Sequence, residues 1–252
     1  MTGKSTLSLM RAVALGFIAI CAAMLVGQTG ARADIYVIES TAPAVNVGVR
    51  LSVDDAFTIP AGAYIRVVLP SGKTQTIRGP HNGKVADLAK GAQNESMMAW
   101  VRDMLKTGGS TEVTTGATRS VKRDAGKPRG FSLEEVPSAV DGDICVVKGS
   151  QVLLTRTSAA RMDRVSVVDT TSGERAEVVW EAGSPTAPWP AALQLRPDGA
   201  YQLFLQDRPR RQITLRVLEA APDDSDVLTE LHKRGCRHQF GAWLRERSVA
   251  GK

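Results

Sequence analysis

The segment from Ala63 to Arg78 reads AYIRVVLPSGKTQTIR and decides the fold class. Its two arms are rich in β-branched residues, and Pro70-Ser71-Gly72 lies between them. Proline fixes φ and glycine accepts a positive φ, so this tripeptide favours a tight turn. We therefore expect a β-hairpin at 63–78. Shorter alternating runs precede it at 34–39, 49–53 and 56–59, and the fold is predicted to be mainly β.

The second half of the chain predicts β structure again. The runs 143–148 and 151–155 flank Gly149-Ser150 and are expected to form another hairpin. Later strands are expected at 164–169, 175–180, 200–206 and 212–218. This spacing favours a small Ig-like β-sandwich over residues 131–222.

Two helical intervals are also expected. Asn94 is predicted to cap a helix that Gly108-Gly109 ends, which completes a first domain at 34–106. Residues 107–130 are polar and basic, so they are predicted to form a flexible linker. The C-terminal segment 223–252 is predicted to be helical, with Asp223, Asp224 and Ser225 as candidate caps and Gly235 as a break.

The first 33 residues have the three parts of a secretory signal peptide. Lys4 and Arg11 precede the apolar run 12–26, and Ala31-Arg32-Ala33 matches a signal peptidase site. Cleavage is therefore expected between Ala33 and Asp34. An uncleaved anchor is the alternative, but fifteen residues of helix span only about 22 Å of a roughly 30 Å hydrocarbon core. The predicted location is the periplasm, or alternatively the extracellular medium, with no transmembrane segment after cleavage.

Charge argues against nucleic-acid binding. Residues 1–33 contain three basic and no acidic residues, so the remaining 219 residues carry 29 Lys and Arg against 26 Asp and Glu. Both signs are mixed along this part of the chain, which is typical of a soluble surface.

Two cysteines remain after cleavage, Cys145 and Cys236. An even number in an oxidising compartment predicts a disulfide. A closed loop of about 90 residues would contribute roughly 4–5 kcal/mol to stability by the chain-entropy estimate. Two unpaired buried thiols are the alternative.

The first half resembles the FecR-type periplasmic domain, in which short strands alternate with glycine turns. The matching segments are Val47-Gly48, 59–63, 69–74 and Arg78-Gly79-Pro80. The whole layout is also similar to a group of uncharacterised exported proteobacterial proteins. The FecR resemblance implies a small β domain with a sensing or regulatory role outside the cytoplasm. It implies no catalytic residues.

No motif predicts catalysis or a cofactor. His232, Cys236 and His238 have zinc-like spacing, but a structural zinc site needs a fourth ligand and Cys145 competes for Cys236. Gly72-Lys73-Thr74 lacks the earlier glycine of a phosphate-binding loop and joins two strands. Trp180 and Trp189 can either stack on sugar rings or pack in a core, and burial is the more common role of tryptophan.

The sequence therefore favours a non-catalytic periplasmic binding, adaptor or sensor-associated protein, whose envelope protein partner it does not identify. Phe240, Trp243 and Leu244 form an apolar stripe that either closes the core or offers a docking surface. The alternative is an envelope hydrolase that acts on glycan or peptide. Such an enzyme would bring His81 or a C-terminal histidine within hydrogen-bond reach of a serine or carboxylate.

Overall fold

A computed structural model describes residues 34–107, 130–206 and 208–250 of the chain. The fold is mainly β with a C-terminal helical segment, as predicted. The predicted signal peptide up to Ala33 and almost all of the predicted linker, 108–129, lie outside these residues. The described residues belong to one compact unit.

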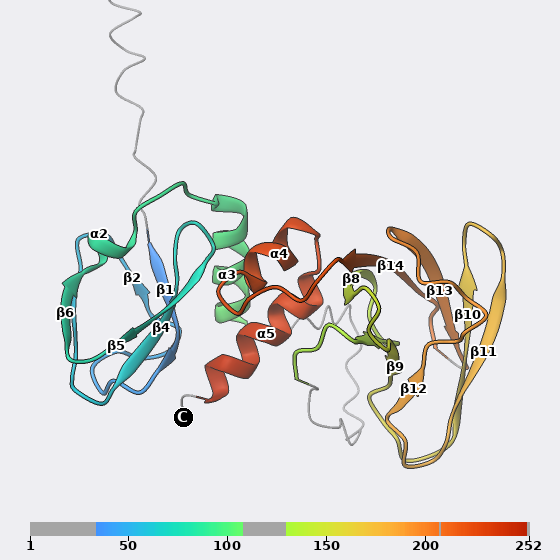
Figure 1. Cartoon of the computed structure of the whole chain (residues 1–252). Helices are drawn as coiled ribbons and strands as arrows, with labels where there is room; N and C mark the ends of the chain where they lie inside the picture. The colour runs from blue at the N-terminus through green and yellow to red at the C-terminus, as the bar shows by residue number, and fades with distance from the viewer. Residues whose placement is uncertain (1–33, 108–129, 207, 251–252) are drawn as a thin grey trace, which may run out of the picture. The chain divides into compact units, whose positions relative to one another are not determined.

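The first β region contains two small antiparallel sheets (Figure 1). The larger has the order β2-β1-β4-β5, formed by Arg50–Leu51, Ile35–Ser40, Tyr64–Val68 and Thr74–Arg78. The hairpin predicted at 63–78 is confirmed, because β4 and β5 pair with Tyr64 opposite Arg78 and Val68 opposite Thr74. The smaller sheet pairs β3 (Ala56–Ile59) with β6 (His81–Lys84), and the short helix α2 (Val85–Leu88) follows it. Alternate residues of β1, β3 and β4, together with Ile77 of β5 and Val85 of α2, fill one apolar core.

Helix α3 (Glu95–Lys106) begins where the sequence predicted. The Asn94 side-chain oxygen accepts a hydrogen bond from the Met97 amide at 3.1 Å, which satisfies one of the free N–H groups of the first turn. Gly72, at the β4–β5 turn, has φ 93° and packs so closely on Met97 that a Cβ there would lie 2.5 Å from its side chain. The positive φ is the reason that this turn favours glycine, and a side chain here would also have to displace the end of the Met97 side chain.

The second β region is a sandwich of two sheets around one core. The five-stranded sheet has the order β11-β10-β13-β14-β8, formed by Arg175–Trp180, Asp163–Asp169, Gly199–Leu205, Arg211–Leu218 and Gly142–Val147. The three-stranded sheet has the order β12-β9-β7, formed by Thr186–Pro188, Leu153–Thr155 and Glu135–Pro137. Trp180 and Trp189 lie in the core, and their indole N–H groups donate to the carbonyls of Leu154 and Leu193. Packing is thus the role of both tryptophans.

The hairpin predicted at 143–155 is wrong. Strand β8 pairs in parallel with β14, whereas β9 pairs with β7 and β12 in the other sheet. The turn at Gly149 carries the chain from one sheet across to the other, so that Val146 and Leu154 bury their side chains in the same core from opposite sides. Burial between two sheets therefore outweighs local hairpin pairing.

Two helices close the chain, α4 (Val227–Lys233) and α5 (Arg237–Ala250). Gly235 ends α4 as predicted: its φ is 77°, its amide donates to the His232 carbonyl, and the Cys236 amide donates to the Leu231 carbonyl. These bonds form a Schellman motif. The predicted side-chain cap is wrong, since Asp226 occupies the N-cap position without a capping bond and Asp224 pairs instead with Arg66 and Arg247.

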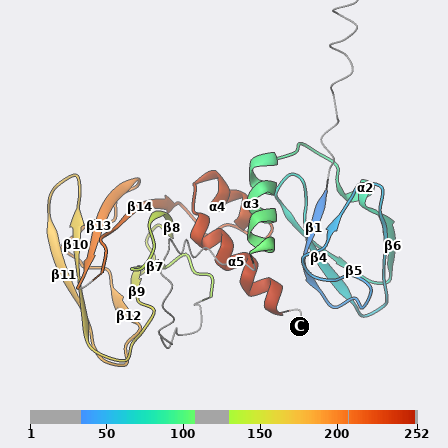
Figure 2. The same cartoon turned by 180° about the vertical axis from the view of Figure 1, so that it is seen from behind.

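A third apolar core joins the two β regions. It collects side chains from β1, β4, α3, β8, β14, α4 and α5, and α3 lies beside the two C-terminal helices in both views of the molecule (Figures 1 and 2). Polar contacts reinforce it on the β4–β5 side: the Thr74 amide donates to the Ser225 carbonyl at 2.9 Å, and Lys73 pairs with Asp226 at 3.1 Å. No helix within the described ranges is both long and apolar enough to cross a membrane.

Candidate functional site

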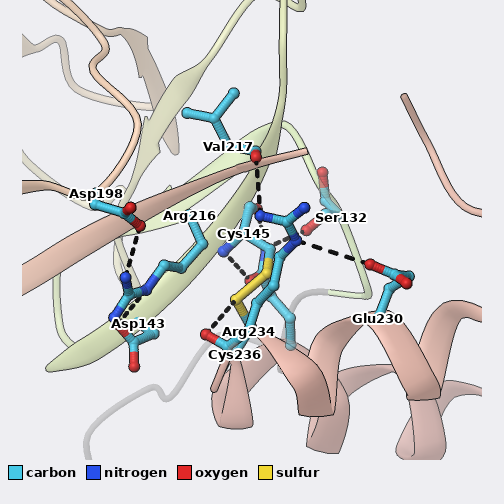
Figure 3. Close-up of a disulfide and its surroundings, with 10 residues drawn as sticks. Ser132, Asp143, Cys145, Asp198, Arg216, Val217, Glu230, Arg234 and Cys236 are labelled. Carbon is cyan, nitrogen blue, oxygen red and sulfur yellow. Dashed lines mark hydrogen bonds and ion pairs between the residues drawn. A yellow bond between two sulfur atoms is a disulfide. The ribbon is translucent and has the colours of Figure 1, made fainter. Parts of the chain in front are cut away.

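The disulfide predicted between Cys145 and Cys236 is confirmed, with Cα atoms 5.8 Å apart (Figure 3). Its position follows from strand alternation. Ile144 and Val146 face the sandwich core, so Cys145 between them faces the C-terminal helices. The Schellman turn after α4 places Cys236 opposite. Both cysteines are fully buried, and the bond fastens the tail to the five-stranded sheet.

Gln239 covers the open edge of strand β8 beside the disulfide. Its side-chain oxygen accepts from the Cys145 amide at 2.7 Å, and its side-chain nitrogen donates to the Cys145 carbonyl at 2.7 Å and to the Ser132 carbonyl at 2.9 Å. The primary amide therefore repeats the hydrogen-bond pattern of a neighbouring strand. Gln239 is only 3% exposed. The sequence assigned no role to Gln239, because a single glutamine in a helix carries no distinctive structural signal.

Two arginines complete the surroundings of the disulfide (Figure 3). Arg216 donates to Asp198 at 2.6 Å and to Asp143 at 2.8 Å, and these hydrogen bonds raise its pKa above the ordinary value despite partial burial. Arg234 donates to the Val217 carbonyl at 3.2 Å and lies 3.8 Å from Glu230. Each arginine thereby ties β14 to a neighbouring element. The chemistry of this region is that of a structural clasp.

The apolar stripe of α5 is buried. Phe240 is 0% exposed, and Trp243 and Leu244 are each 1% exposed. All three lie in the core that joins the two β regions. The docking-surface interpretation of these residues is therefore wrong, and the core interpretation is confirmed. The core that they close is shared by both β regions and does not belong to the second region alone.

One serine lies within hydrogen-bond distance of a histidine. Ser96 in the first turn of α3 and His232 in α4 are 3.1 Å apart between Oγ and Nε2. Trp100 contacts the imidazole edge to face, with ring centroids 4.8 Å apart. Burial lowers the pKa of His232, which favours its neutral form. Among the described residues, no carboxylate hydrogen-bonds the second ring nitrogen.

The other histidines lie apart from this pair. His81 in β6 stacks on Phe57 with centroids 5.4 Å apart. His238 is partly buried at the start of α5, where desolvation and, secondarily, Arg245 lower its pKa. The disulfide takes Cys236 out of the zinc-like trio, and the part of the chain that the structure describes contains no group of three or more candidate metal ligands.

The predicted cleavage site is described only on its C-terminal side. Asp34 directly precedes β1 and pairs with Arg50 at 2.6 Å, and Ala33 lies outside the described residues. No known family model matches the sequence, and a search of curated proteins found no match.

Proposed function

We propose that this chain is an exported, non-catalytic binding or adaptor protein of the bacterial envelope, with a FecR-like first β region that gives it a sensor-associated role. The observation that carries the proposal is the buried Cys145–Cys236 disulfide. Structural disulfides persist in the periplasm and outside the cell, whereas cytosolic thiols are kept reduced. The features of residues 1–33 agree with that location.

The arrangement of the three cores supports a role as a binding platform. Both β regions contact one helical layer, and the disulfide and Gln239 hold that layer to β8. A platform fastened in this way keeps strand edges and loops of both regions in fixed positions, which lowers the entropic cost of binding a partner. Recognition would then use these edges and loops and would need no cofactor.

Two measurements test the proposal. Fractionation of the native host should place the protein in the periplasmic fraction, beginning at Asp34 and with both cysteines oxidised. Residues 34–252 used as bait in periplasmic extract should retain a stoichiometric envelope protein. The Cys145→Ala/Cys236→Ala variant is the matched control, because it loses the clasp but keeps the surface residues. A cytosolic protein with free thiols would refute the proposal.

The contact between Ser96 and His232 favours a second candidate, an envelope hydrolase. A histidine within hydrogen-bond reach can act as the base that activates a serine nucleophile. The oxidised protein should then react with a fluorophosphonate probe, and Ser96→Ala and His232→Gln should both abolish labelling. Ser158→Ala, which alters an exposed serine away from the histidines, should leave it unchanged. An unlabelled wild-type protein would leave the adaptor as the function.

A further inference from the structure

Strand β11 (Arg175–Trp180) forms one edge of the five-stranded sheet. It pairs only with β10, and both views show it at the margin of its sheet (Figures 1 and 2). The Asp169 amide donates to the Glu174 carbonyl, so these two opposite residues form a hydrogen-bonded pair. In an antiparallel ladder such pairs recur at every second residue. Residues 176, 178 and 180 therefore bond to β10, whereas the N–H and C=O groups of Arg175, Glu177 and Val179 point away from the sheet.

The outward backbone groups of β11 have no partner among the described residues. The side chains at these positions are also free to bind. Arg175 and Glu177 are exposed and lie two residues apart on the same face of the strand, and neither forms an ion pair with any described side chain. Val179, which follows on this face, is 40% exposed. The edge thus offers a hydrogen-bonding template with one cation and one anion in fixed register.

This pattern is complementary to itself under twofold symmetry. If two β11 strands run antiparallel with Ala176 at the centre, Arg175 of each copy lies directly opposite Glu177 of the other. Both residues have outward backbone groups, so each such pair forms two backbone hydrogen bonds as well as a cross-strand ion pair. Centring the pairing on Glu177 would instead place two like charges opposite each other, which is unfavourable.

We infer that β11 is a homodimerisation edge, through which two copies of this chain join their five-stranded sheets into one continuous sheet. The occupant is a second copy because the alternating charges match that strand itself in the antiparallel register. An interface of one short strand is small, and such interfaces are weak and transient. The dimer should therefore form at high protein concentration. This inference goes beyond the proposed function and does not depend on it.

Charge exchange tests the interface and its register. Residues 34–252 should sediment as a monomer–dimer equilibrium in analytical ultracentrifugation. Arg175→Glu alone and Glu177→Arg alone should each weaken association about tenfold, because two attractive cross-strand pairs become repulsive. The double variant Arg175→Glu/Glu177→Arg should restore wild-type association, since the pairs are then reversed but again opposite in charge.

Glu177→Pro provides an independent test. It removes an N–H group that points away from β10, so the sheet should fold while the edge loses its ability to pair. Circular dichroism and the unfolding midpoint would confirm that each variant is folded. A wild-type protein that stays monomeric at high micromolar concentration would overturn the inference. So would a dimer that is insensitive to the single exchanges, or a double variant that fails to recover.

Discussion

Replacing Gln239 by leucine should destabilise the protein more than any other single polar substitution near the disulfide. The side chain makes three hydrogen bonds, two to the backbone of Cys145 and one to Ser132, and it is almost fully buried. Leucine has a similar size, so the main loss is polar. The Cys145 amide and carbonyl would be left buried without partners, and the half-buried Ser132 carbonyl would lose its donor.

The size of this loss follows from the count of bonds. A net contribution of about 1 kcal/mol per hydrogen bond gives about 3 kcal/mol for the three bonds. The desolvation of the groups that remain raises this value, and partial entry of water lowers it. We therefore expect Gln239→Leu to lower the free energy of unfolding by about 2–4 kcal/mol.

Urea unfolding of the oxidised protein, followed by tryptophan fluorescence, measures this change. Gln212→Leu is the matched control, because Gln212 is exposed on β14 and its side chain has no hydrogen bond to a described residue. It should change stability by no more than about 0.5 kcal/mol. If Gln239→Leu is as stable as the control, the argument that Gln239 completes the edge of β8 is refuted.

Three further outcomes are expected. The Cys145→Ala/Cys236→Ala variant should lose about 4–5 kcal/mol of unfolding free energy, because the disulfide closes a loop with a sequence separation of 91. A wild-type protein whose urea midpoint is unchanged by reductant would contradict this expectation. Trp243→Ala should lose about 3–5 kcal/mol by leaving a cavity in the shared core, whereas Met162→Ala, at a residue 53% exposed, should have little effect on the thermal midpoint. Burial raises the pKa of Asp169, but hydrogen bonds from the Thr171 and Ser172 amides and the Arg196 guanidinium outweigh it and hold that pKa below its ordinary 3.8. Asp169 therefore stabilises the fold above about pH 4 and loses this effect as the pH falls through its lowered pKa. Wild type should lose more unfolding free energy than Asp169→Asn between pH 5 and pH 2, and equal losses would show that Asp169 is not the group involved.

The sequence predicted those features whose cause is local. The turn residues Pro70-Ser71-Gly72 predicted the first hairpin, and Asn94 predicted the start of α3. The disulfide was predictable because only two cysteines follow the predicted signal peptide.

Features that depend on distant segments were predicted wrongly or missed. Gly149-Ser150 resembles a hairpin turn, but β8 pairs with β14, some seventy residues away. The sequence close to a strand carries no signal for a parallel partner so far along the chain. Asp224 has the chemistry of a helix cap, yet Arg66 and Arg247 approach it only in the folded chain. For the same reason, neither the Ser96–His232 contact nor the role of Gln239 could be found from spacing.

The pairing of β8 has a consequence for how the chain acquires its structure. Three partners of β8 lie within the last fifty residues of the sequence: its neighbouring strand β14, Cys236 of the disulfide and Gln239 at its outer edge. During synthesis, β8 therefore emerges long before its neighbouring strand β14, although the Val147 amide has an earlier partner in the Leu133 carbonyl. Completion of the sandwich is delayed until β14 and α5 are made, and folding should be slow because its decisive contacts span long stretches of chain. The final helix is in this sense the last step of assembly, and a chain that stops before it leaves a strand open to aggregation.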